Sequence, residues 1–477
     1  MPRISKAIWR FARDHAAHLR MGLLALLLLA CATVLRVQQV RAAHAAQAAA
    51  YKVTHPAELA RITFAAAGDV IPHQAVRQSA EAHADHATAA AQPAPDDHSG
   101  WDYLFAAVAD AFRQVDFGFV NLETPVAPKN SRGTRAFLFN APPELLDALK
   151  AAGIKLVSFA NNHVMDQGWD GFGETLEELR AHGILAVGAA PNAQDAWKPV
   201  VVEKDGLRVG WLGMTRWLNG GRNPEKPDLP HVAFLPYPAD AGGAPGLDEA
   251  GVLAAVRAAR AQCDLLVVSI HWGTEYATEP RPDDTLLAHG MMEAGATLVL
   301  GSHPHVLQSI ETYRTQDGRD GVIVYSLGNF LSNQSRNYVN GLMPDRTGEP
   351  RDSLLVRFAV VRRDYGLAGT RVELADFGIM PLWTENNRLA LQSGQTRQPC
   401  IRPVFIDREI PRVQARFDEL NKLGEKLSPE ERKELLEVSK RLELLQHRRE
   451  LLLQRTGDDY VVPPPPAGAA ATAAPCN

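Results

Sequence analysis

The sequence is poor in cysteine, in long apolar runs and in excess charge. Its four cysteines have the spacing of neither a zinc knuckle nor a disulfide framework; they are Cys31, Cys263, Cys400 and Cys476. The net charge of −5 in 477 residues offers no basic footprint for nucleic acid, so we expect no nucleic-acid partner. The basic residues that would hold a polyanion are not clustered along the chain. These absences leave a large globular protein whose chemistry must come from other side chains.

The longest apolar run, from Met21 to Leu35, is shorter than the ~20 residues that span a bilayer comfortably. Basic residues precede it and Arg36 follows it, which is the order of an export signal whose basic side stays in the cytoplasm. Leu28-Leu29-Ala30-Cys31 resembles a lipoprotein box. Three outcomes stay open: an inner-membrane anchor facing the periplasm or exterior, a lipoprotein at Cys31, or cleavage near Ala43 to Ala45. Each predicts a location in the cell envelope.

The pattern divides the chain into four parts. Residues 1–60 are predicted to be the signal or membrane anchor and a linker, and residues 61–385 an α/β domain. Residues 386–456 are predicted to be a C-terminal helical extension, since Glu409 to Gln454 has charged, helical periodicity and Ser428-Pro429 is a helix start. Residues 457–477 read as a disordered tail rich in proline and alanine.

Polar side chains follow five apolar, strand-like segments of the predicted α/β domain. Within three residues of the ends of these segments stand Asp69, Glu123, Asn162 with His163, and His271, and His303 with His305 follow the fifth segment. In open α/β sheets, ligands bind beyond the carboxyl ends of the strands, so these side chains are expected to share one crevice. Carboxylates, an amide and imidazoles together favour Mn, Fe or Zn. We therefore predict a site for one or two divalent ions.

The ordered motifs resemble those of a known family. They are Gly68-Asp69, Asn121-Leu122-Glu123, Ala160-Asn161-Asn162-His163, His271-Trp272-Gly273-Thr274-Glu275-Tyr276, Gly301-Ser302-His303-Pro304-His305-Val306 and Tyr325-Ser326-Leu327-Gly328-Asn329-Phe330. The series resembles the CapA-type family of bacterial capsule and poly-γ-glutamate synthesis, an offshoot of the calcineurin-like metallophosphoesterase superfamily. The resemblance covers roughly residues 61 to 335. It implies a metallophosphoesterase-like α-β-β-α sandwich, to which the helical hairpin is appended.

The resemblance also implies roles for individual residues. The implied metal ligands are Asp69, Glu123, Asn162, His271, His303 and His305. It implies that His163 is the catalytic proton donor. Asp166 and Glu275 are expected to support ligating or catalytic histidines, or to face the substrate. The superfamily begins with Asp-x-His, whereas this chain has Ile71 two residues after Asp69. His73 lies two further on; whether it compensates stays open, and it is expected, like Asp166 and Glu275, to support the site or to face the substrate.

Three functions fit these observations. The first is a protein of capsule or poly-γ-glutamate biosynthesis with a metal-dependent hydrolase-like site, acting on an ester or amide bond. The second is a non-catalytic scaffold that holds the polymer or its synthase. The third is a general phosphodiesterase of the envelope. The partners implied are an anionic envelope polymer or its membrane synthase, with the membrane contacted by the N-terminal segment.

Overall fold

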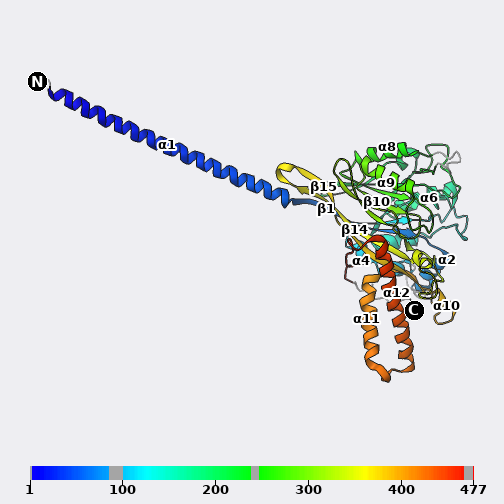
Figure 1. Cartoon of the computed structure of the whole chain (residues 1–477). Coiled ribbons are helices and arrows are strands. Elements are labelled where there is room, and N and C mark those ends of the chain that lie inside the picture. The colour runs from blue at the N-terminus through cyan, green and yellow to red at the C-terminus, as the bar shows by residue number, and fades with distance from the viewer. Residues whose placement is uncertain (1–2, 85–99, 238–245, 467–475, 477) are drawn as a thin grey trace, which may run out of the picture. The chain divides into compact units, whose positions relative to one another are not determined.

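The computed structural model describes residues 3–84, 100–237, 246–466 and 476 (Figure 1). The chain divides into two compact units, one of residues 1–59 and 362–371 and one of residues 60–361 and 372–477. The first unit holds α1 (Arg3–Thr54), and within it Lys52 Nζ lies 3.5 Å from Asp364 Oδ2. The stretch Arg20–Thr54 of α1 contains a window that is long and apolar enough to cross a membrane, with none of it buried. Helix formation thus continues well past the apolar run seen in the sequence.

The second unit is built on two sheets. The eight-stranded sheet has the order β16 (Ile401–Phe405), β15 (Thr370–Asn386), β14 (Asp352–Asp364), β1 (Ala57–Val70), β2 (Phe117–Leu122), β3 (Ile154–Ser158) and β4 (Leu185–Val187), with β13 (Asn329–Leu331) also beside β1. The six-stranded sheet has the order β11 (Ile310–Arg314), β12 (Asp320–Val324), β10 (Leu298–Ser302), β9 (Leu265–His271), β7 (Leu207–Thr215) and β6 (Val200–Lys204). A short pair joins β5 (Ala189–Ala190) to β8 (His231–Val232).

The helices of this unit lie in the connections between strands. They are α2 (Gln74–His83), α3 (Trp101–Phe105), α4 (Ala109–Arg113), α5 (Glu144–Ala151), α6 (Gly168–Ala181), α7 (Ala193–Ala196), α8 (Glu249–Arg260), α9 (Pro282–Ala294) and α10 (Arg388–Gln392). Two long helices, α11 (Ile406–Leu423) and α12 (Pro429–Thr456), end the chain as an antiparallel pair (Figure 1). Ser428 caps α12 in a capping box with Glu431, with Pro429 in the first turn, which confirms the helix start predicted there.

Three apolar cores explain the layer order. Successive residues of a strand face opposite sides of a sheet, so Leu156 packs between the two sheets while Val157 packs against α5 and α6. In the second sheet, Val267 faces the same central core, and Val268 faces α8 and α9. Strands buried on both faces read as continuous apolar runs in the sequence. The unit is therefore an α-β-β-α sandwich, as the fold class predicted.

The sandwich extends beyond the boundary expected at residue 385. β16 pairs antiparallel with β15, with Trp383 opposite Val404, although it lies within the segment predicted to be a helical extension. Part of the predicted disordered tail is also ordered, since the Ile379 amide donates to Tyr460 O at 2.8 Å and the Val462 amide donates to Ile379 O at 3.0 Å. Residues 467–475 and 477 of that tail lie outside the described residues. Cys400 and Cys476, whose spacing gave no sign of pairing, form a disulfide across 76 positions.

Candidate metal centre

The predicted site residues gather where the carboxyl ends of both sheets meet. Asp69 lies near the end of β1 and Glu123 directly after β2, whereas His271 ends β9 in the other sheet. Close packing of the backbone holds β1 here. A side chain at Gly68 would place its Cβ 1.8 Å from Gly328 O, and the Asp69 amide donates to the same carbonyl at 3.1 Å. Only glycine allows this approach, which fixes the start of the site.

Two carboxylates, Asp69 and Glu123, form the floor of the site, and both are completely buried. The Asn121 amide Nδ2 lies between them, 2.8 Å from Asp69 Oδ1 and 3.4 Å from Glu123 Oε2. Burial, followed by the charge of Asp69, raises the pKa of Glu123 well above its usual value. Glu123 Oε1 has no hydrogen-bond partner within the described residues. A buried carboxylate oxygen without a partner is costly, so a cation would stabilise it.

Three imidazoles point at this unpaired oxygen. Glu123 Oε1 lies 3.7 Å from His271 Nε2, 3.8 Å from His305 Nε2 and 4.0 Å from His163 Nε2. These separations are too long for hydrogen bonds. His303 Nδ1 is also buried without a hydrogen-bond partner among the described residues. Burial lowers the pKa of both His271 and His303 well below the usual value, and neutral imidazole is the form that binds metal.

The donor atoms form three overlapping groups, each with its atoms within 4.8 Å of one another. The groups are Glu123 with His271 and His303, Asp69 with Glu123 and His305, and Glu275 with His303 and His305. Together with the two unpaired buried atoms, this mixed set of oxygen and nitrogen donors fits a divalent cation. Glu275, which was expected to be a supporting residue, thus places a carboxylate oxygen in one group with His303 and His305. Unlike these two histidines, Glu275 is exposed to solvent.

The loop after β10 presents two of these histidines in an unusual backbone conformation. His303 has φ 96° and His305 has φ 60°, values that residues other than glycine seldom adopt. Pro304 between them fixes its own φ and restricts the residue before it. His305 Nδ1 lies 3.2 Å from Asp69 Oδ2, which ties the loop to β1. Strained conformations of this kind persist where the surroundings enforce them, often at functional sites.

His163 belongs to none of the three donor groups found among the described residues; the carboxylate of Asp166 holds its ring. Its Nδ1 lies 2.8 Å from Asp166 Oδ2, and Asp166 also accepts from the Phe139 amide at 2.6 Å. The His163 amide donates to Asn161 Oδ1 at 3.1 Å. The ring is therefore fixed at Nδ1 with Nε2 turned toward Glu123. This is the arrangement in which a carboxylate orients a histidine that exchanges a proton.

Asn162 lies beside His271. Its Oδ1 is 2.9 Å from His271 Nε2, and its Nδ2 donates to Asn219 Oδ1 at 3.2 Å. The other ring nitrogen, His271 Nδ1, lies 2.9 Å from Ser302 Oγ. The Asn162 Oδ1 atom and the His271 Nε2 atom thus meet between the two sheets. The contact with Ser302 fixes the orientation of the His271 ring.

Asn121 is the central residue to which sequence reasoning assigned no role. Besides contacting both carboxylates, it accepts from Asn161 Nδ2 at 3.2 Å and so joins two motifs. A signal was present, because Asn121 lies two residues before Glu123 at the end of a strand, and such residues share a face. The side-chain amide of Asn121 can donate to both carboxylates, which is the contact that two neighbouring acids need.

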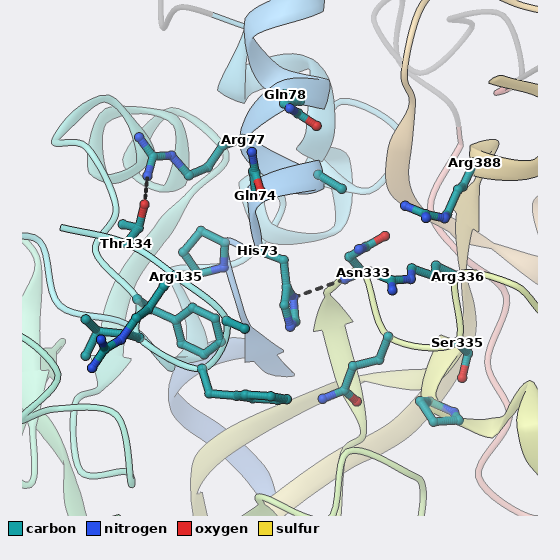
Figure 2. A pocket seen from close by; sticks show the side chains of 18 of the residues that line it. His73, Gln74, Arg77, Gln78, Thr134, Arg135, Asn333, Ser335, Arg336 and Arg388 are labelled. Carbon is teal, nitrogen blue, oxygen red and sulfur yellow. Dashed lines mark hydrogen bonds between the residues drawn. The ribbon is translucent and has the colours of Figure 1, made fainter. Parts of the chain in front are cut away.

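His73 does not stand in for the missing histidine at position 71. Ile71 is buried in the core, and no group of donor atoms found in the described residues includes His73. The Asn333 amide donates to His73 Nδ1 at 3.2 Å instead. Burial, followed by the charge of His305, lowers the pKa of His73 to about 4. His73 lines a neighbouring pocket instead (Figure 2), and its expected role of supporting the site or facing the substrate stays a prediction.

Two curated proteins are identical to this chain at about a third of the aligned positions. The capsule biosynthesis protein CapA of Bacillus anthracis is 32% identical over 273 residues, which cover 56% of this chain and 60% of that protein. The PGA biosynthesis protein CapA of Bacillus subtilis (strain 168) is 32% identical over 273 residues, covering 57% and 64%. The chain therefore spans less than two thirds of the length of either relative.

Among solved structures, the NAD nucleotidase NadN of Haemophilus influenzae has a TM-score of 0.37 at 10% identity, covering 68% of this chain and 52% of that one. Residues 63–334 match the family described as "Bacterial capsule synthesis protein PGA_cap". The matched range contains every predicted ligand and more than half of the chain. The chain belongs to the bacterial capsule synthesis protein family PGA_cap.

Proposed function

We propose that this protein acts in capsule or poly-γ-glutamate biosynthesis at the cell envelope, with a metal-dependent centre that hydrolyses or transfers an ester or amide bond. The observation that carries the proposal is the convergence of buried donors on Glu123 Oε1, which has no partner of its own in the described part of the chain. The proposed ligands are Asp69, Glu123, Asn162, His271, His303 and His305. A bound ion of Mn, Fe or Zn would polarise the scissile bond and make a bound water more acidic.

The residues of this chain have separate tasks in the proposed reaction. His163 delivers a proton to the leaving group from Nε2, because its other nitrogen is held by Asp166. Asn121 keeps the two acids apart and fixes their orientation. The histidine with its orienting carboxylate favours catalysis over the scaffold alternative, since a purely structural metal site needs no such pair.

Two features support a location outside the cytoplasm. The apolar stretch of α1 is compatible with an anchor. The Cys400–Cys476 disulfide is a bond that persists in oxidising compartments such as the periplasm and is rare in the cytosol. The relatives named for capsule and PGA biosynthesis agree with an envelope role.

The proposal is tested with full-length protein in detergent, loaded with Mn²⁺ and incubated with purified poly-γ-glutamate. We expect new chain ends, and a loss of about 10²–10⁴-fold in rate for His163→Asn with metal content retained. His289→Asn is the matched control, since His289 pairs with Glu311 at 2.8 Å elsewhere in the fold.

Each other outcome selects an alternative. Cleavage of a chromogenic phosphodiester, with poly-γ-glutamate left intact, would identify a general envelope phosphodiesterase. Metal binding without turnover of either substrate would support the scaffold and contradict the catalytic proposal.

A further inference from the structure

A large pocket lies beside the metal centre and is lined by five arginines. Its volume is about 1160 Å³, larger than the ~300–1000 Å³ typical of sites for single small ligands. The lining arginines come from separate segments: Arg77, Arg135, Arg336, Arg346 and Arg388. Figure 2 shows Arg336 and Arg388 on one side of His73, with Arg77 and Arg135 on the other. The sequence showed no basic cluster because the fold alone gathers these residues.

Among the described residues, the arginines that line this pocket outnumber the acids that line it. Two glutamates, Glu81 and Glu349, also line it, and Glu349 is already paired with Arg455 at 3.0 Å. Within the described residues, none of the five arginines has a carboxylate at salt-bridge distance; Arg77 contacts Thr134 Oγ1 at 3.4 Å. Arg388 Nε is buried and has no hydrogen-bond partner there. Like charges gathered without partners repel one another, so an anionic ligand would stabilise this arrangement.

The pocket shares its wall with the metal centre. The Phe139 ring lines it and lies 4.4 Å from the His163 ring, measured between centroids. Tyr276 lines it too; its amide donates to Pro304 O at 2.8 Å, in the loop that carries His303 and His305. A chain held in the pocket would therefore lie next to the proposed proton donor and ligands.

The lining also suits the apolar part of such a chain. Phe137 lines the pocket and is 80% exposed, so its ring is free to contact a ligand. Leu138 and Phe139 follow it in the same loop. Methylene groups between charged groups would contact these side chains, while the charged groups reach the arginines. Guanidinium groups bind carboxylates through two parallel hydrogen bonds, which gives the contacts direction.

We infer that this arginine pocket is a binding subsite for several successive carboxylates of an anionic chain, whose bond to be cleaved lies at the metal centre. The inference rests on the proposed function and gives its substrate class a location. The size of the pocket, the spread of its charges over separate segments and its shared wall with His163 favour a chain over a single anion. We choose Arg336 and Arg388 as the principal contacts because Figure 2 shows them on the same side of His73, and Arg388 Nε is buried without a hydrogen-bond partner among the described residues.

The test measures binding separately from turnover. A fluorescent decamer of γ-linked glutamate is titrated with full-length protein in detergent, and its anisotropy gives Kd; the decamer is checked for cleavage afterwards. We expect Arg336→Gln/Arg388→Gln to weaken binding about tenfold or more, and added salt to weaken wild-type binding. Arg180→Gln/Arg257→Gln is the matched control, since both arginines are exposed outside the pocket lining.

The outcomes distinguish the two proposals. Arginine-dependent binding of a decamer that is never cleaved supports the pocket and contradicts the catalytic proposal. Equal affinity of wild type and the pocket variant, or no binding by wild type, overturns the pocket even if cleavage occurs. Polyphosphate competing better than unlabelled poly-γ-glutamate overturns the assignment to carboxylates in favour of a phosphate-bearing chain.

Discussion

Buried charges in the metal centre and at the base of the α11–α12 hairpin are treated in opposite ways. Glu385 contacts Arg402 at 3.3 Å and Arg441 at 2.5 Å. Burial raises the pKa of Glu385, but these two arginines outweigh it and hold the pKa below its usual value. Glu123 is also buried, and no Lys or Arg of the described residues is paired with it, so burial and the charge of Asp69 raise its pKa instead.

The difference separates charges that build the fold from charges that await a ligand. Arg448 of α12 is completely buried and donates from Nε to Asp352 Oδ1 at 3.0 Å, and Arg441 also contacts Glu409 at 2.6 Å. The pairs of Arg448 with Asp352 and of Arg441 with Glu385 attach α12 to the sheets, and the pair of Arg441 with Glu409 joins α12 to α11. The hairpin is complete without additional groups, whereas the metal centre keeps unpaired buried atoms. A buried carboxylate oxygen without a partner among the described residues, as at Glu123, distinguishes the metal centre from the base of the hairpin.

Removing one partner of an ion pair at the base of the hairpin should have the largest effect on the free energy of unfolding. Arg448→Met leaves Asp352 buried and unpaired, which we expect to lower the free energy of unfolding by about 3–5 kcal/mol. Metal content should not change. Denaturant unfolding and elemental analysis measure the two quantities, and Lys433→Met on the exposed face of α12 is the control. Loss of metal in Arg448→Met would remove the distinction between the two regions.

The disulfide should have the next largest effect. Cys400→Ser opens a loop of 76 residues, which we expect to cost about 2–4 kcal/mol of stability, chiefly by freeing the unfolded chain. Cys31→Ser, which replaces an exposed free thiol, is the control. Thermal unfolding with and without reductant measures the change. A reductant effect that persists in Cys400→Ser would show that this bond is not responsible.

The smallest change in free energy is expected inside the metal centre. Glu123→Gln should weaken metal binding by about 100-fold, or about 2.7 kcal/mol, because the amide keeps the shape and loses the charge. In the presence of chelator, stability should be unchanged or higher, since a buried unpaired charge has been removed. Metal titration and unfolding of the stripped protein test this, with Glu177→Gln, an exposed acid of α6, as the control. Strong destabilisation of the stripped variant would assign Glu123 to the fold.

Much of the fold and of the site could be predicted from local patterns. Apolar runs that end in Asp69, Glu123, Asn162 and His271 identified both the strands and the convergence of their ends, because parallel strands place their carboxyl ends at one edge. The helix start at Ser428 could also be predicted from the sequence, because a capping box involves residues only three positions apart. β16 was missed because it follows a helical segment and gains its stability only by pairing with β15.

The sequence by itself determined which polar residues follow the central strands and where the last helix begins, since propensity, capping and period act over a few positions. Only the tertiary structure decided that Glu275 lies with His303 and His305, that Cys400 meets Cys476, and that five arginines share one pocket. Those neighbours are distant along the chain. Their proximity follows from the packing of two sheets, and side-chain patterns along one segment hold no information about the segment that will lie opposite.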